Sequence, residues 1–187
     1  MSNPEYPRVD VEALPDAPNP TTHKKEVDEA LGIEAFGFNV YTARPGERLP
    51  WGYHYHLDHE ELLYVIEGEL ELETPETRGT GGDDDGGTAD GGGEDEGEPP
   101  RLAAGEALLV SPGAPQCTRA VGDSVTRVIA AGAPKDADGA VISEFCPACE
   151  EHTDRTYDQN ETDDGPVYVL SCADCGEETD RLRAGPE

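Results

Sequence analysis

The chain has 187 residues, of which 42 are acidic and 13 are lysine or arginine, so its formal net charge is −29. This length favours one main domain that can bury a core. The negative charge argues against nucleic acid and against an anionic membrane as partners, because polyanions repel one another.

Arginine outnumbers lysine among the basic residues, with ten arginines and three lysines. Acidic excess with few lysines is typical of proteins that fold in molar salt, where ions screen self-repulsion, so we expect a halophilic protein. The N-terminal residues lack the basic and apolar segments of a signal peptide, and no stretch reaches the roughly 18 apolar residues of a membrane-spanning helix. We therefore expect a cytoplasmic location, where clustered cysteines are metal ligands or free thiols rather than disulfides.

Residues 1–30 are rich in proline and charge, and their prolines all lie between positions 4 and 20. Proline removes a backbone donor and fixes φ, so it blocks regular structure. We expect an extended N-terminal arm with one short helical turn in the sequence KKEVDEALG.

Residues 31–135 consist of short alternating stretches separated by turn residues. The clearest are IEAFGFNVYTA, ELLYVIEGELELE, GEALLVSP and SVTRVIAA. Strands this short and this regularly interrupted predict an all-β domain, an antiparallel barrel or sandwich. A turn is expected at residues 67–68.

Residues 76–100 interrupt these strands with nine glycines and nine acidic residues. Such a segment has too few apolar groups to offset the entropy of ordering itself. We expect a disordered loop that closes a hairpin, at a cost that grows slowly with its length.

The stretch HYHLDHEELLYVIEGE, residues 54–69, carries the first group of metal-ligating residues. On a strand, residues i and i+2 face the same side, so His54 and His56 project together toward the barrel interior. A carboxylate from an adjoining strand would complete three nitrogen and oxygen ligands, a set suited to divalent iron, manganese, nickel or zinc.

This stretch resembles the first motif of the cupin family, G-x5-H-x-H-x3,4-E-x6-G. His54 and His56 supply H-x-H, Glu61 follows after four residues, and Gly68 follows after six more. Glu60 also meets the first spacing, but only Glu61 meets the distance to the glycine. Glu60 and His59 are therefore interpreted as neighbours of the ligands. The leading glycine of the motif is displaced.

The sequence GEALLVSPGAPQCTRAVGD resembles the second cupin motif, G-x5-P-x-G-x2-H-x3-N. Gly105 opens it and Gly113 takes its turn position, while Ser111 replaces the first proline. Gln116 occupies the place where the family has its fourth ligand, a histidine; an amide oxygen can ligate, but it is uncharged and weaker. The resemblance implies an antiparallel double-stranded β-helix, the cupin or jelly-roll barrel, with a transition metal at His54, His56, Glu61 and Gln116.

The remaining residues, from about position 141 to 187, are organised by two Cys-x-x-Cys pairs. Their members are Cys146 with Cys149, and Cys172 with Cys175. Two such knuckles complete a tetrahedral thiolate shell, so we expect a zinc-ribbon-like module with structural zinc or iron. His152 is interpreted as an exposed neighbour, and Cys117 as a small buried residue.

A cupin barrel followed by four cysteines is similar in layout to bacterial 3-hydroxyanthranilate dioxygenases. We expect a metal-binding cupin that acts on or senses a small molecule; the alternatives are a metal-dependent dioxygenase and a non-enzymatic ligand-binding or protein-interaction module. Arg48, Arg119 and Tyr64 could meet an anionic substrate, but a surface position is favoured for the arginines. Pairing of two barrels as a homodimer is also expected.

Overall fold

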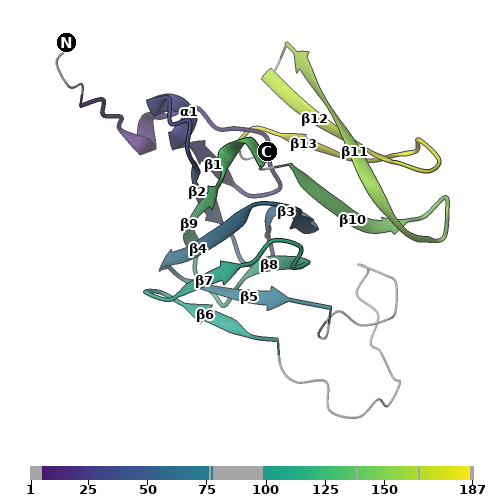
Figure 1. Ribbon diagram of the computed structural model, residues 1–187, viewed down its shortest axis with the longest axis horizontal. Coiled ribbons are helices and arrows are strands. Elements are labelled where there is room, and N and C mark those ends of the chain that lie inside the picture. The colour runs from purple at the N-terminus through teal and green to yellow at the C-terminus, as the bar shows by residue number, and fades with distance from the viewer. Residues whose placement is uncertain (1–5, 76, 78–98, 138, 164, 186–187) are drawn as a thin grey trace.

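The computed structural model describes residues 6–75, 77, 99–137, 139–163 and 165–185, and within them the strands form two antiparallel sheets (Figure 1). One sheet has the order β1 (His23–Glu26), β2 (Gly37–Ala43), β9 (Thr126–Ala133), β4 (Glu60–Glu67) and β7 (Ala107–Val110). The other has the order β13 (Glu178–Arg183), β12 (Gly165–Cys172), β11 (Glu151–Thr162), β10 (Ala140–Cys146), β3 (Arg48–His56), β8 (Gln116–Val121), β5 (Glu69–Glu73) and β6 (Arg101–Ala103). The helical segments are short: η1 (Val11–Ala13), α1 (Val27–Leu31) and η2 (Lys135–Ala137).

The main core lies between the inner faces of the two sheets. Strand β4 shows why, because its odd-numbered residues from position 61 to 65 are buried while Leu62, Tyr64 and Ile66 are exposed. This alternation of period two is what a strand with one buried face requires. The buried apolar cluster is drawn from both sheets: Tyr41, Ala43, Leu49, Leu63, Val65, Leu70, Leu102, Ala120, Val128 and Ala130.

The turn expected at residues 67–68 joins β4 to β5. Gly68 has a φ of +79°, a conformation that residues with a side chain rarely adopt. A β-carbon at this position would lie 2.5 Å from Thr126 Oγ1, so the turn also needs the smallest residue to pack on β9.

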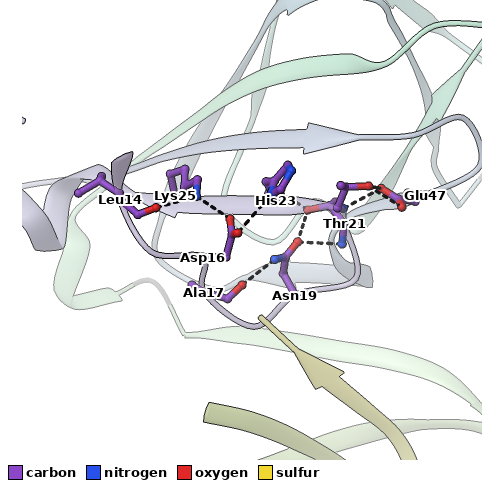
Figure 2. A network of polar contacts seen from close by, with 9 residues as sticks. Leu14, Asp16, Ala17, Asn19, Thr21, His23, Lys25 and Glu47 are labelled. Atoms are coloured by element: carbon purple, nitrogen blue, oxygen red, sulfur yellow. Dashed lines mark hydrogen bonds and ion pairs between the residues drawn. The ribbon is translucent and has the colours of Figure 1, made fainter. Parts of the chain in front are cut away.

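The N-terminal arm carries strand β1 and the short helix α1. Beyond the last proline of the arm, His23–Glu26 forms strand β1 on the edge of β2, and α1 follows directly. Lys25 Nζ contacts Asp16 Oδ1 at 2.9 Å, and the backbone N–H of Thr22 donates to Glu47 Oε2 at 2.8 Å. Figure 2 shows how this polar network fastens the arm to the barrel. The arm can pair because residues 21–30 contain no proline and because β2, without β1, would be an edge strand with unpaired backbone groups.

The C-terminal strands extend the barrel sheet. Strand β10 pairs antiparallel with β3, and its register places Ala140 opposite His56 and Ile142 opposite His54. Figure 1 shows β10 running from the barrel to the long hairpin of β11 and β12. A second small core packs Ile142 against Leu170 and Leu182. One sheet therefore joins β3 of the barrel to β10, while a domain boundary near residue 140 stays a prediction.

The predicted disordered loop, 76–100, lies outside the described residues except at positions 77, 99 and 100. Within the described part of the chain, no helix has the length and apolar content needed to cross a membrane.

Candidate metal centre

Strand β3 brings the two histidines to the barrel interior by way of a bulge. Its register with β8 runs from Leu49 opposite Thr118 to His54 opposite Gln116, so β3 inserts extra residues between the two pairs. Bulges bend a strand and turn its side chains toward a new direction. Beyond the bulge, His54 is fully buried and His56 is 7% exposed.

Glu61 and Gln116 reach the same place from other strands. Glu61 is the first inward residue of β4, in register with Gly132 on β9, and it is 7% exposed. Ligand atoms of His54, His56 and Glu61 all lie within 4.8 Å of one another. Gln116, on β8, is 3% exposed and its Nε2 lies 3.3 Å from His54 Nε2. All four residues named from the motifs are thus brought together.

The hydrogen bonds of His54 determine its tautomer. Its Nδ1 lies 2.8 Å from the carbonyl oxygen of Gly52, and a carbonyl only accepts, so Nδ1 carries the proton. The lone pair of Nε2 then points at Gln116 and the other ligand atoms. Burial lowers the pKa of His54 from 6.5 to about 4, so the ring is neutral at neutral pH and ready to ligate.

The loop before β8 is fastened over the cluster. The backbone N–H of Gly113 donates to the carbonyl of His56 at 2.7 Å, which ties the second motif to the first. Gly113 adopts a φ of +75°, as a turn glycine does. The Oε1 of Gln116 is buried without a hydrogen-bond partner among the described residues. A buried polar atom in that state is costly, and a bound cation would satisfy it.

His59 lies beside the cluster and is 3% exposed. Its Nδ1 donates to the carbonyl of Pro134 at 2.9 Å, and its ring centroid lies 4.8 Å from that of His56. The sequence predicted His59 to be a neighbour of the ligands, but it did not predict that the side chain is buried. Gly132 was a usable signal for it, because a glycine inside a strand often marks a close approach.

The four cysteines form the second cluster. Their sulfur atoms all lie within 4.8 Å of one another, although Cys146 and Cys172 are buried and Cys175 is exposed. The two knuckles share one backbone pattern: Glu150 N–H donates to the carbonyl of Cys146 at 2.8 Å, and Gly176 N–H to that of Cys172 at 2.9 Å. Each knuckle therefore turns its two sulfurs toward a common point.

Polar groups on β11 support this cluster. The hydroxyl of Thr153 lies 3.1 Å from Cys172 Sγ, and this hydrogen bond, together with backbone N–H donors of the second knuckle, lowers the pKa of Cys172 to about 6. Buried Arg155 donates through Nη1 to the Thr153 hydroxyl at 2.6 Å and through Nη2 to the carbonyl of Phe145 at 2.8 Å. Neither residue was identified from the sequence, because a single threonine or arginine outside any motif gives no sign that it hydrogen-bonds near a cysteine cluster.

The remaining candidates belong to neither cluster. Half-buried Arg48 contacts Glu144 Oε1 at 3.2 Å, and Arg119 donates to the carbonyl of Gly46 at 2.9 Å. Tyr64 faces outward, and exposed His152 packs against Phe145 with ring centroids 5.8 Å apart. Cys117 is buried, which raises the pKa of its thiol to about 12.

No protein-family model matches the chain, and no curated protein matches it in sequence. Solved structures match its fold. A sugar phosphate isomerase from a cupin superfamily, from Silicibacter pomeroyi, gives a TM-score of 0.56 at 15% identity, over 92% of this chain and 97% of that one. The polyketide cyclase RemF from Streptomyces resistomycificus gives 0.50 at 18% identity, over 73% of this chain and 84% of that one.

At these identities the likeness concerns the fold alone. It agrees with the two facing antiparallel sheets and with the core between them. The chain therefore folds as an antiparallel double-stranded β-helix of the cupin type, with a cluster of four cysteines toward its C-terminus.

Proposed function

We propose that this protein binds a divalent transition metal in its barrel, through His54, His56 and Glu61 with Gln116 as a fourth contact, and acts on or senses a small molecule there. The observation that carries the proposal is the convergence of three ligating side chains from two strands, with atoms within 4.8 Å of one another in a buried site. Iron, manganese, nickel and zinc all accept two imidazoles and a carboxylate.

The electrostatics of the donor set fit a dication. Two neutral imidazoles and one carboxylate carry one negative charge, and an ion would offset the burial cost of that charge. His54 holds its proton on Nδ1 and presents Nε2, the form in which an imidazole ligates. An ion held there would supply Lewis-acid chemistry to a bound carbonyl or other oxygen ligand. The chain's own residues would orient the ligand and exclude water, since all four side chains are almost fully buried.

We also propose that Cys146, Cys149, Cys172 and Cys175 hold a structural zinc or iron ion. Four thiolates fill a tetrahedral shell and leave no position for a substrate. The role of this ion would be to stabilise β10–β13, whose small core contains Ile142, Leu170 and Leu182 with Tyr168 beside them.

Gln116 favours a second candidate function, binding without turnover. An amide is a weaker and uncharged donor than imidazole, so the ion would be held less firmly than by three histidines. In that case the barrel would bind a small molecule and the cysteine module would contact a partner protein. A dioxygenase is the alternative that the layout of barrel and cysteine module favours.

Metal analysis of the purified protein tests both sites. We expect one ion held tightly by the four cysteines and a second, exchangeable ion that His54→Ala removes. Gln116→His should strengthen retention of the second ion, because the new imidazole faces His54 across the β3–β8 register. A single ion unaffected by His54→Ala would refute the barrel site.

A further inference from the structure

Glu144 lies outside the cluster of ligands but contacts the bulge that carries His54. It belongs to β10, two residues before Cys146, and its side chain is 22% exposed. Its Oε1 accepts the backbone N–H of Tyr53 at 2.7 Å and contacts Arg48 Nη1 at 3.2 Å. A carboxylate from the C-terminal strands, that of Glu144, therefore binds the backbone N–H of the residue that precedes the proposed ligand His54.

The contact at Tyr53 acts on a single peptide group. The N–H of Tyr53 and the carbonyl of Gly52 are the two ends of one planar peptide unit. Its N–H donates to Glu144, while its carbonyl accepts from His54 Nδ1 at 2.8 Å. Glu144 thus holds the orientation of the group that determines the tautomer of His54.

Charge strengthens this arrangement. A carboxylate that accepts from a peptide N–H polarises the peptide, and hydrogen bonds in such a chain reinforce one another in a low dielectric. The Gly52 carbonyl becomes a better acceptor, so His54 Nδ1 keeps its proton and Nε2 becomes a better donor of its lone pair. Partners of this kind behind a histidine ligand are known to raise metal affinity.

The local sequence provides room for the contact. Gly52 has a φ of +126°, and a β-carbon there would lie 2.5 Å from Glu144 Oε1. Any larger residue at position 52 would displace the carboxylate. On the other side, Arg155 Nη2 donates to the backbone carbonyl of Glu144 at 3.0 Å, which fixes β10 against β11. Strand β10 lies between β3 and β11 in the sheet order, so its residues can contact both strands (Figure 1).

We propose that Glu144 is a positioning residue for the barrel metal site, acting through the peptide group between Gly52 and Tyr53 to fix His54 as its Nδ1–H tautomer. The inference rests on the proposed function, because it assigns one more residue to the same site. It also gives the C-terminal strands a role at the barrel, since they supply this carboxylate.

The test measures metal affinity and the tautomer of His54 separately. The full chain, with zinc already at the cysteines, is titrated with Mn²⁺ and the free ion is followed by electron paramagnetic resonance; His54→Ala supplies the background from surface carboxylates. We expect Glu144→Ala to weaken Mn²⁺ binding about tenfold or more. Glu144→Gln keeps an acceptor but loses the charge, so its loss should be smaller. Glu161→Gln, an exposed glutamate on β11, is the matched control and should change nothing.

The tautomer is read in metal-free protein from the ¹⁵N shifts of the His54 ring. The parent chain should show a protonated Nδ1, and the two Glu144 variants should show a growing share of the other tautomer. Parent-like affinity and tautomer in a folded Glu144→Ala chain would overturn the positioning role and leave the proposed function standing; if that variant does not fold, an unchanged tautomer in Glu144→Gln would do the same. A parent chain that binds no more Mn²⁺ than His54→Ala would instead refute the barrel site.

Discussion

Gly132 lies directly against the imidazole of His59, so closely that a β-carbon at position 132 would overlap His59 Nε2. Gly132 is also the register partner of Glu61, and the His59 ring lies 4.8 Å from that of His56. A residue with no side chain therefore determines where a buried ring lies beside two proposed ligands.

Gly132→Ala should consequently disturb both stability and the barrel site. The added methyl group must displace His59 or the strand, and overpacking of this kind costs about 1–3 kcal/mol. Urea unfolding measures the first effect, and Mn²⁺ titration above the His54→Ala background measures the second. Gly139→Ala is the control, because a β-carbon at position 139 meets no atom within 4 Å. Equal losses of stability and of Mn²⁺ binding in the two variants would contradict a role for the close contact between Gly132 and His59.

Glu150 is the one non-glycine residue with a positive φ in the described ranges, at 57°. It follows the first cysteine knuckle just as Gly176, with a φ of 75°, follows the second. Because the left-handed conformation costs a residue with a β-carbon about 1 kcal/mol, Glu150→Gly should raise the stability of the metal-loaded protein by about that amount. Thermal unfolding checks this. Gly176→Ala should lower the thermal stability instead. A Glu150→Gly protein less stable than the parent would show that the Glu150 side chain has another role.

The buried His54 should make the metal-free protein sensitive to acid. Its pKa is about 4 in the folded state and 6.5 in the unfolded chain, so the unfolded state binds the proton more readily. The resulting stability is fully present above pH 6.5 and is lost as the pH falls toward 4, up to a limit of about 3 kcal/mol. Urea unfolding at pH 7 and pH 5 should show a steeper loss in the parent chain than in His54→Gln, and parallel losses would contradict the assignment.

Removal of the metal from the cysteines should open the C-terminal strands before the barrel. The apolar core there is small, so β11–β13 would depend on an ion at the cysteines for their stability. We expect Cys146→Ser to lose about one equivalent of zinc, the content of a four-cysteine site, and to speed amide exchange in β11–β13. Cys117→Ser, which changes a buried thiol outside the cluster, is the control and should keep its zinc. Retention of zinc by Cys146→Ser would refute the four-thiolate site.

Local spacing explains which parts of the site could be predicted. His54 and His56 share a face because strands alternate, and Glu61 is the first inward residue of the next strand. The alternating stretches likewise predicted an antiparallel all-β fold, which the two sheets confirm. These features depend on residues close together in the chain.

Long-range pairing explains what could not be predicted. Nothing near Glu144 indicates that β10 lies beside β3, because strand pairing over such a separation is determined by the packing of the whole barrel. Arg48 was favoured as a surface residue, yet it is half-buried against Glu144 for the same reason. The burial of His59 similarly depends on Gly132, which is distant in sequence and adjacent in space.

The pairing of β10 with β3 also affects how these molecules behave toward one another. Without residues 140–185, β3 would be an edge strand with unpaired backbone groups, and such an edge is a template for pairing with other chains. The C-terminal strands cover that edge and end the sheet in β13, whose exposed charged residues discourage further addition. A chain shortened before β10 would therefore be expected to aggregate, even with every barrel ligand in place.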